Sequence, residues 1–187
     1  WYTLRRCGMA TQKPDGGQEL LFNPHFFKDP FQVEVNTRPL KKEALLMPGI
    51  FFDDEFKDRV LRYVPSVVPP LTGTIYGADF AKDMTPSEAY ARTAENIFTP
   101  REFIATLAFC IAHDRRMKKE EKKILRTGGD SSNIFCVRSR GRLVSVWVDM
   151  NLVMDHFEGI GVHGFYDVKS PLEDDGEDRW DDVRFFV

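Results

Sequence analysis

Apolar positions follow helical spacing most clearly between residues 100 and 126. The apolar residues recur mostly three or four positions apart, at Phe103, Ile104, Leu107, Cys110, Ile111, Met117, Ile124 and Leu125. Thr99, Pro100 and Glu102 supply an N-cap, a first-turn proline and a carboxylate for reciprocal capping, and two glycines follow the apolar pattern. The pattern predicts one long helix over residues 100–126.

Two shorter helices are predicted upstream. Asp53 has the properties of an N-cap, and apolar residues at helical spacing follow it until Pro65, which must end the helix. A second helix starts at Thr85, where Thr-Pro-Ser-Glu repeats the capping pattern, and we expect it to extend to about Asn96.

Alternating or continuous apolar runs predict strands elsewhere. They lie at residues 31–35, 134–137, 143–148, 160–168 and 183–187. The second and third are separated by Ser139-Arg140-Gly141, which indicates a tight hairpin. Residues 143–148 carry apolar side chains on both faces, so we expect a central strand.

These elements predict an α+β fold. An N-terminal extended arm and three helices would precede a mainly antiparallel sheet of three to five strands, covered by the long helix 100–126. Residues 1–30 contain many prolines and glycines and form the expected extended or partly disordered arm, and residues 31–187 form a single α+β domain.

Composition fits an ordinary folded protein. Of 187 residues, 42% are hydrophobic and 29% charged, which excludes a wholly disordered chain. No apolar run approaches the roughly 20 residues that span a bilayer, and residues 1–8 lack the apolar stretch of a secretion signal. Cys7, Cys110 and Cys136 are odd in number and include no CxxC pair. We therefore expect a cytoplasmic protein without a membrane partner.

Charge is distributed unevenly along the chain. Residues 114–142 carry ten basic and four acidic residues, a net charge of +6, whereas residues 167–187 carry three basic and eight acidic residues, a net charge of −5. The basic residues are Arg115, Arg116, Lys118, Lys119, Lys122, Lys123, Arg126, Arg138, Arg140 and Arg142. Such a basic patch is typical of proteins that contact nucleic acid or an acidic protein. Because Glu120 and Glu121 interrupt the lysines, a solvated helix end is the alternative.

One group of residues has side chains suited to catalysis. His156 and His163, with Asp155 and Asp167, could provide general acid-base chemistry. They match no metal-ligand motif, and we predict neither a metal site nor a cofactor. Glycines at 159, 161 and 164 match G-x-G-x-x-G, but a strand-like segment follows them instead of a helix, so close packing explains them better. The acidic loop 173–178 lacks a carboxylate at the first position of a calcium loop.

The sequence favours a binding or accessory protein over an enzyme. In this hypothesis the basic helix end and the arginine hairpin contact nucleic acid or an acidic protein, and the acidic loop competes with that partner. The alternative is a small-ligand binder or enzyme with a pocket between helix and sheet that uses His156 or His163. A third hypothesis is a homodimer that buries aromatic surface and exchanges the N-terminal arm.

Overall fold

A mixed seven-stranded sheet forms the centre of the molecule. The computed structural model describes residues 22–45, 49–92, 97–118, 122–127, 132–154, 157–167 and 183–187, of which 46% lie in strands and 25% in helices. The strands are β1 (Phe27–Asn36), β2 (Leu40–Lys41), β3 (Ile50–Phe52), β4 (Val67–Val68), β5 (Thr72–Phe80), β6 (Ser132–Ser139), β7 (Arg142–Met154), β8 (Phe157–Asp167) and β9 (Val183–Phe186).

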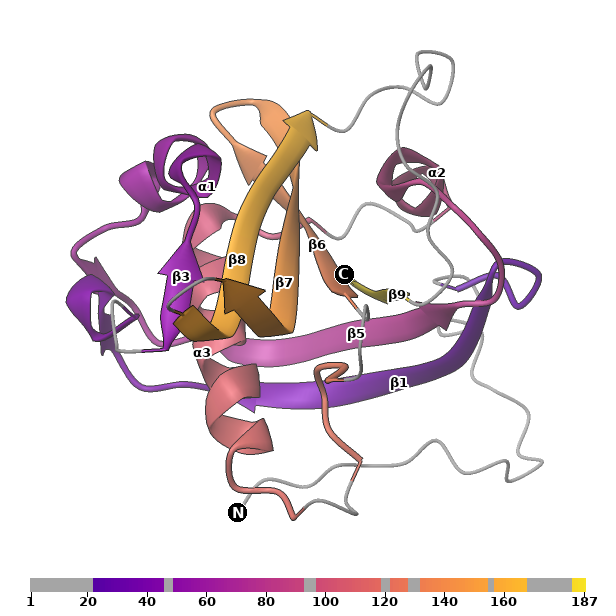
Figure 1. Ribbon diagram of the computed structural model, residues 1–187, viewed down its shortest axis with the longest axis horizontal. Helices are drawn as coiled ribbons and strands as arrows, with labels where there is room; N and C mark the ends of the chain where they lie inside the picture. Colours follow the sequence, from indigo (N-terminus) through magenta and orange to yellow (C-terminus); the bar gives the residue numbers. More distant parts are fainter. Residues whose placement is uncertain are drawn as a thin grey trace.

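The strand order of this sheet is β1-β5-β9-β6-β7-β8-β3. β3 pairs with β8 and β9 pairs with β6 in parallel, and the other neighbours are antiparallel. β2 and β4 form a separate two-stranded sheet. In Figure 1, β1 and β5 run across the view while β7 and β8 run up it, so the sheet is strongly twisted.

The described helices are short, and each α-helix starts at a predicted cap. They are α1 (Asp54–Arg59), α2 (Pro86–Ala91), α3 (Pro100–Asp114) and the 3-10 turns η1 (Lys42–Leu45) and η2 (Leu61–Tyr63). Asp53 accepts a hydrogen bond from the backbone N–H of Phe56, and Thr85 and Thr99 each form a reciprocal capping box with the glutamate three residues later. The three predicted N-caps are therefore confirmed.

Apolar side chains fill both faces of the sheet. On one face, α1 and α3 pack against inward side chains such as Val35, Phe135 and Val146. On the other face, α2 and the segment before β1 pack against Ile134 and Phe185. Figure 1 shows α1 beside β3 and β8, and α2 at the opposite end of the molecule. Cores on both faces explain why β6 and β7 carry apolar residues at successive positions.

The predicted fold class is wrong in its proportions and in its order. Three α-helices do not precede the sheet as a group, because β1, β3 and β5 come before α3 in the chain. The described sheet has seven strands and includes two parallel pairs, which exceeds the predicted three to five mainly antiparallel strands. One strand is longer than predicted, because β7 continues past the predicted end at residue 148 to Met154 through a bulge.

The predicted long helix ends at Asp114, twelve residues early. Ile124 and Leu125 do not continue the helix, although they are buried. Instead the Asp114 carboxylate accepts hydrogen bonds from the backbone N–H groups of Ile124 and Leu125, at 2.9 and 2.8 Å. A short polar side chain that bonds backbone groups in this way competes with helix continuation. The chain therefore turns back and places the two apolar residues in the core by another route.

Several other predictions from the sequence are confirmed. The hairpin of residues 134–148 is confirmed, with Arg140 and Gly141 at its turn, as is the strand at residues 183–187. Gly164 is confirmed as a close-packing residue, because a Cβ there would lie 2.7 Å from the Phe56 backbone. Of the arm predicted over residues 1–30, residues 1–21 lie outside the described residues, and β1 begins within the arm at Phe27. The acidic loop 173–178 also lies outside the described residues, and no described helix is long and apolar enough to span a membrane.

Candidate functional site

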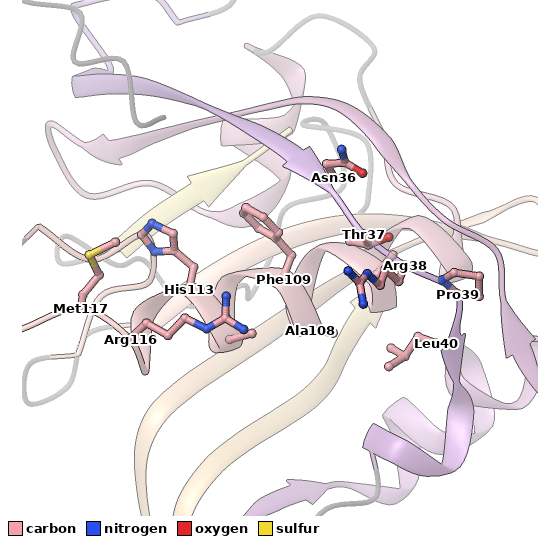
Figure 2. A pocket seen from close by; sticks show the side chains of 12 residues that line it. Asn36, Thr37, Arg38, Pro39, Leu40, Ala108, Phe109, His113, Arg116 and Met117 are labelled. Carbon is pink, nitrogen blue, oxygen red and sulfur yellow. The ribbon is translucent and has the colours of Figure 1, made fainter. Parts of the chain in front are cut away.

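A cleft of about 610 Å³ lies between α3 and the connection from β1 to β2. We call it the α3 cleft. Its floor is apolar and consists of Leu40, Ala105, Ala108, Phe109 and Ala112. The volume falls within the range of roughly 300–1,000 Å³ that is usual for ligand sites. Figure 2 shows that the labelled lining side chains come from α3 and the residues after it on one side, and from the β1–β2 connection on the other.

Two arginines lie at the rim of the α3 cleft. Arg38 comes from the β1–β2 connection and Arg116 from the end of α3, and both side chains are exposed. Figure 2 shows both guanidinium groups over the same side of α3, extending from opposite ends of the cleft. No aspartate or glutamate is among the residues that line the cleft. An anion entering it would therefore meet two positive charges and no nearby lining carboxylate.

The backbone that presents Arg38 is held in place by hydrogen bonds. The Thr37 N–H donates to the Leu71 carbonyl at 2.9 Å, and Thr37 Oγ1 accepts from the Leu71 N–H at 2.8 Å. Four residues after Arg38, Lys42 Nζ donates to the Leu61 carbonyl at 2.6 Å. These contacts anchor both ends of the connection, so Arg38 is an exposed side chain on a fixed backbone.

His113 also forms part of the cleft wall. Its Nδ1 lies 3.0 Å from Asp114 Oδ1, and its ring stacks on Phe109 with 6.2 Å between ring centroids. Because Asp114 also accepts two backbone N–H groups, the carboxylate has a fixed position and in turn orients the imidazole. Only 8% of His113 is exposed, so it forms part of the wall.

The cysteine near this histidine in α3 is not reactive. Cys110 lies one turn before His113 and is fully buried. Burial raises the pKa of the Cys110 thiol well above its ordinary value, and the negative charge of Asp114 raises it further. A buried thiol that stays protonated is unreactive. The Cys110 thiol is therefore no nucleophile for the α3 cleft.

The predicted basic residues fall into two groups at opposite ends of α3. Arg115, Arg116 and Lys118 are exposed just beyond its C-terminal end. The hairpin residues Arg138, Arg140 and Arg142 are also exposed, but the Arg138 N–H donates to the Phe98 carbonyl just before α3 begins. Fifteen helical residues span about 22 Å. The structure thus brings one predicted basic residue, Arg116, into the α3 cleft and separates it from the hairpin.

The remaining basic residues lie near the returning segment after α3. Lys122 is exposed, with its ammonium 5.8 Å from the Phe31 ring centroid, and Lys123 is half-buried. Arg126 is half-buried and its Nη1 lies 3.4 Å from Asp79 Oδ2, so this arginine belongs to a structural ion pair. Lys119 lies outside the described residues.

The predicted catalytic group is only partly described. His156 and Asp155 lie outside the described residues, and the side chain of Asp167 is also outside them. His163 Nδ1 lies 3.4 Å from Asp53 Oδ2, and Asp53 also accepts N–H groups from Phe56 and Gly164. Asp53 thereby joins α1 to β8, and His163 does not line the α3 cleft.

Two site residues, Arg38 and His113, were not identified from the sequence. Arg38 precedes Pro39 in a connection without periodicity, and Arg116 is 78 positions away, so no local spacing relates them. His113 was obscured because it directly precedes the basic run. In the described ranges, no three histidine, cysteine, aspartate or glutamate side chains converge as a metal site would require.

Comparisons of the chain with protein-family models, with curated proteins and with solved structures found no match. The geometry of the α3 cleft is therefore the basis for proposing a function.

Proposed function

We propose that this protein is a non-catalytic binding protein whose α3 cleft takes up an acidic, partly apolar segment of a partner protein. The observation that carries this proposal is the placement of Arg38 and Arg116 around one apolar floor whose lining contains no carboxylate. In this proposal the basic end of α3 has the binding role predicted from the sequence, and Arg38, not the hairpin arginines, acts with it.

The chemistry of the rim favours carboxylates. A guanidinium group presents a planar fork of donors that matches a carboxylate in a two-bond arrangement. Exposed ion pairs contribute only about 0.2–1 kcal/mol each, so two arginines alone would give weak binding. Apolar side chains of the partner supply the remaining binding energy by covering Leu40, Ala108 and Ala112, which are partly or fully exposed. Acidic and apolar residues are therefore both needed in the ligand.

Nucleic acid fits the described surface less well. Binding along a phosphate backbone needs a continuous basic track, whereas about 22 Å of α3 separates Arg116 from the hairpin arginines. Single-stranded nucleic acid also needs exposed aromatic faces for base stacking, and Phe109 and His113 are each only 8% exposed. These features favour an acidic protein segment over nucleic acid.

A second candidate function uses the same cleft for a small anionic molecule. Its volume of about 610 Å³ is the observation that favours this reading. Such a ligand would carry a carboxylate and an apolar body. We further propose a cytoplasmic location, supported by the two described cysteines, which are buried free thiols. Homodimer formation stays a prediction, tested by sedimentation at several concentrations.

A fluorescence titration tests the proposal. The probe is a labelled ten-residue peptide of alternating glutamate and leucine, and the controls are an alternating lysine and leucine peptide and a single-stranded oligonucleotide of equal charge. We expect measurable binding of the acidic peptide alone, weakening as salt rises. Excess benzoate, a small carboxylate with an apolar body, tests the second candidate by competition.

The proposed function fails if the acidic peptide does not bind at millimolar concentration in low salt. It fails in favour of nucleic acid if the oligonucleotide binds more tightly than the acidic peptide. Direct binding of benzoate by the chain, observed without peptide binding, would support the small-molecule candidate instead.

A further inference from the structure

His113 has one ring nitrogen that the fold leaves available in the α3 cleft. The residue is only 8% exposed, and its Nδ1 is taken by Asp114 Oδ1 at 3.0 Å. The other ring nitrogen, Nε2, makes no hydrogen bond to any residue that the structure describes. Figure 2 shows the ring on the α3 wall of the cleft. Because buried polar groups are rarely left without a partner, Nε2 indicates where a polar group of an occupant would be bound.

Asp114 determines which nitrogen carries the proton when the ring is neutral. Its carboxylate accepts the backbone N–H groups of Ile124 and Leu125, at 2.9 and 2.8 Å, and an ionised carboxylate can only accept hydrogen bonds. The Nδ1 that faces it must therefore carry a proton. In a neutral ring Nε2 is then a bare acceptor, and it donates only when the ring is protonated. A carboxylate of an acidic ligand can bond to Nε2 only in the protonated ring.

The ionisable groups nearest the ring belong to α3, its end and the facing connection. Asp114 attracts an imidazolium, whereas Arg116 and Arg38, which line the same cleft, repel it. Burial raises the pKa of the Cys110 thiol, so this group stays neutral near pH 7. All of these charges are present with or without a ligand.

The charged groups behind the ring belong to the returning segment and to the sheet. The returning segment carries Lys122, Lys123 and Arg126, with Lys122 over an aromatic ring of β1 and Arg126 against Asp79. Asp79 also accepts two bonds from Arg184, so this carboxylate is already compensated. A carboxylate bound in the cleft therefore adds a negative charge that the cleft lining lacks, and this charge favours the protonated ring.

We propose that His113 takes up a proton from solvent when the acidic segment binds, and that it donates from Nε2 to a carboxylate of that segment. This inference rests on the proposed function, because it concerns the same occupant of the α3 cleft. The imidazolium then bonds to Asp114 through Nδ1 and to the ligand through Nε2, while the rim arginines bind other carboxylates. Binding that takes up a proton strengthens as pH falls. His113 is thus a binding residue whose contribution depends on pH near neutrality, where unperturbed histidine titrates.

A fluorescence titration at pH 6 and pH 8 with the labelled peptide of alternating glutamate and leucine tests the proposal. Glutamate and arginine keep their ordinary charges over this range. We expect the wild-type chain to bind at least fivefold more tightly at pH 6. His113→Gln should bind with less than a twofold difference between the two pH values, because glutamine takes up no proton. His25→Gln, the control at an exposed histidine outside the cleft, should keep the dependence of the wild type.

Two measurements read the proton itself. Calorimetry of peptide binding to the wild-type chain at pH 7.5, in Tris and in Hepes, gives heats that differ if protons are exchanged with the buffer. We expect the difference to show net proton uptake. Nitrogen-15 NMR of histidine-labelled protein should show both ring nitrogens of His113 protonated in the complex, with the signals assigned by their absence in His113→Gln.

Peptide binding with equal heats in the two buffers would overturn the role of His113 and leave the proposed function intact. The same pH dependence in the wild type and in His113→Gln would also overturn it, since other groups would then cause the dependence. Absence of peptide binding at both pH values would overturn the proposed function and this inference together.

Discussion

Arg184 shows how single residues hold this fold together. It is 6% exposed, and its guanidinium bonds both carboxylate oxygens of Asp79, at 2.6 and 3.1 Å. Its Nη1 donates to the carbonyls of Lys123 and Ile124, at 3.1 and 2.7 Å. These bonds join β9 to β5 and to the segment that returns after α3. The predicted acidic C-terminal region therefore contains an arginine whose role is structural.

Replacing Arg184 with lysine should destabilise the protein by about 3 kcal/mol. Lysine keeps the charge but cannot bond both Asp79 oxygens and two carbonyls at once, which leaves buried groups unpaired. Urea unfolding monitored by tryptophan fluorescence measures the change. The matched control is Arg138→Lys at an exposed position, with an expected change within about 0.5 kcal/mol. Equal effects at both positions would contradict this role for Arg184.

Replacing the N-cap threonine of α3 and the buried threonine within α3 by valine should change the free energy of unfolding in opposite directions. Thr99 Oγ1 accepts from the Glu102 N–H, so Thr99→Val loses the cap and should cost about 1 kcal/mol. Thr106 Oγ1 has no hydrogen bond among the described residues, so Thr106→Val should raise the free energy of unfolding by about 1 kcal/mol. Thermal unfolding of both variants measures the signs. A destabilised Thr106→Val would mean that the hydroxyl is bonded in solution.

Cys110 makes stability depend on alkaline pH. Its thiol pKa is raised in the folded protein, whereas the unfolded thiol titrates near 9.0. Above that pH the unfolded state loses a proton that the folded state keeps, so this contribution to stability is complete below pH 9 and declines as pH rises. Urea unfolding from pH 8 to pH 10 should show a steeper decline in wild type than in Cys110→Ala. Identical slopes would contradict the raised pKa.

The sequence predicted the helix N-caps correctly but did not predict which residues form the α3 cleft. Asp53, Thr85 and Thr99 were predicted because capping depends on residues within four positions. The pairing of Arg38 with Arg116 depends on a connection that crosses a helix end, and no local pattern encodes it. Local chemistry was therefore predictable from the sequence, and convergence of distant residues was not.

At the scale of elements, the length of α3 is the main departure from the predicted fold. Apolar spacing is regular up to Ile111 but then jumps six positions to Met117 and seven to Ile124. The step of seven still matches helical spacing, but the step of six does not, and the Asp114 carboxylate bonds the backbone of the returning segment instead. Parallel pairing of β9 with β6 was not predictable, since strand periodicity carries no information on the neighbour.

Packing of α1 on β8 depends on a glycine. A Cβ at Gly164 would lie 2.7 Å from the backbone of Phe56, so Gly164→Ala must displace α1 and should cost at least 2 kcal/mol, which is about the penalty of an overpacked core. Gly73→Ala is the matched control on β5, where a Cβ meets open space and should stabilise the strand by about 0.5 kcal/mol. Urea unfolding compares the two. Equal effects would contradict the close packing of α1.

At the scale of the molecule, the fold separates what the sequence places together. Of the basic residues that lie within 29 positions of the sequence, Arg115, Arg116 and Lys118 are at the C-terminal end of α3 and the hairpin arginines are near its N-terminal end, whereas Arg126 belongs to a structural ion pair. Arg38 joins the group at the C-terminal end because the anchored β1–β2 connection passes beside it. The positive charge that matters for the proposed function is therefore assembled by the fold from two distant parts of the chain.

The most direct test of this account compares two double variants with equal loss of charge. Arg38→Ala with Arg116→Ala removes both rim arginines of the α3 cleft, and Arg138→Ala with Arg140→Ala removes two hairpin arginines. We predict that the first weakens binding of the alternating glutamate and leucine peptide at least tenfold, about 1.4 kcal/mol, and that the second changes it less than twofold. Equal weakening by both would show that net charge alone attracts the peptide and would contradict the α3 cleft as its binding site.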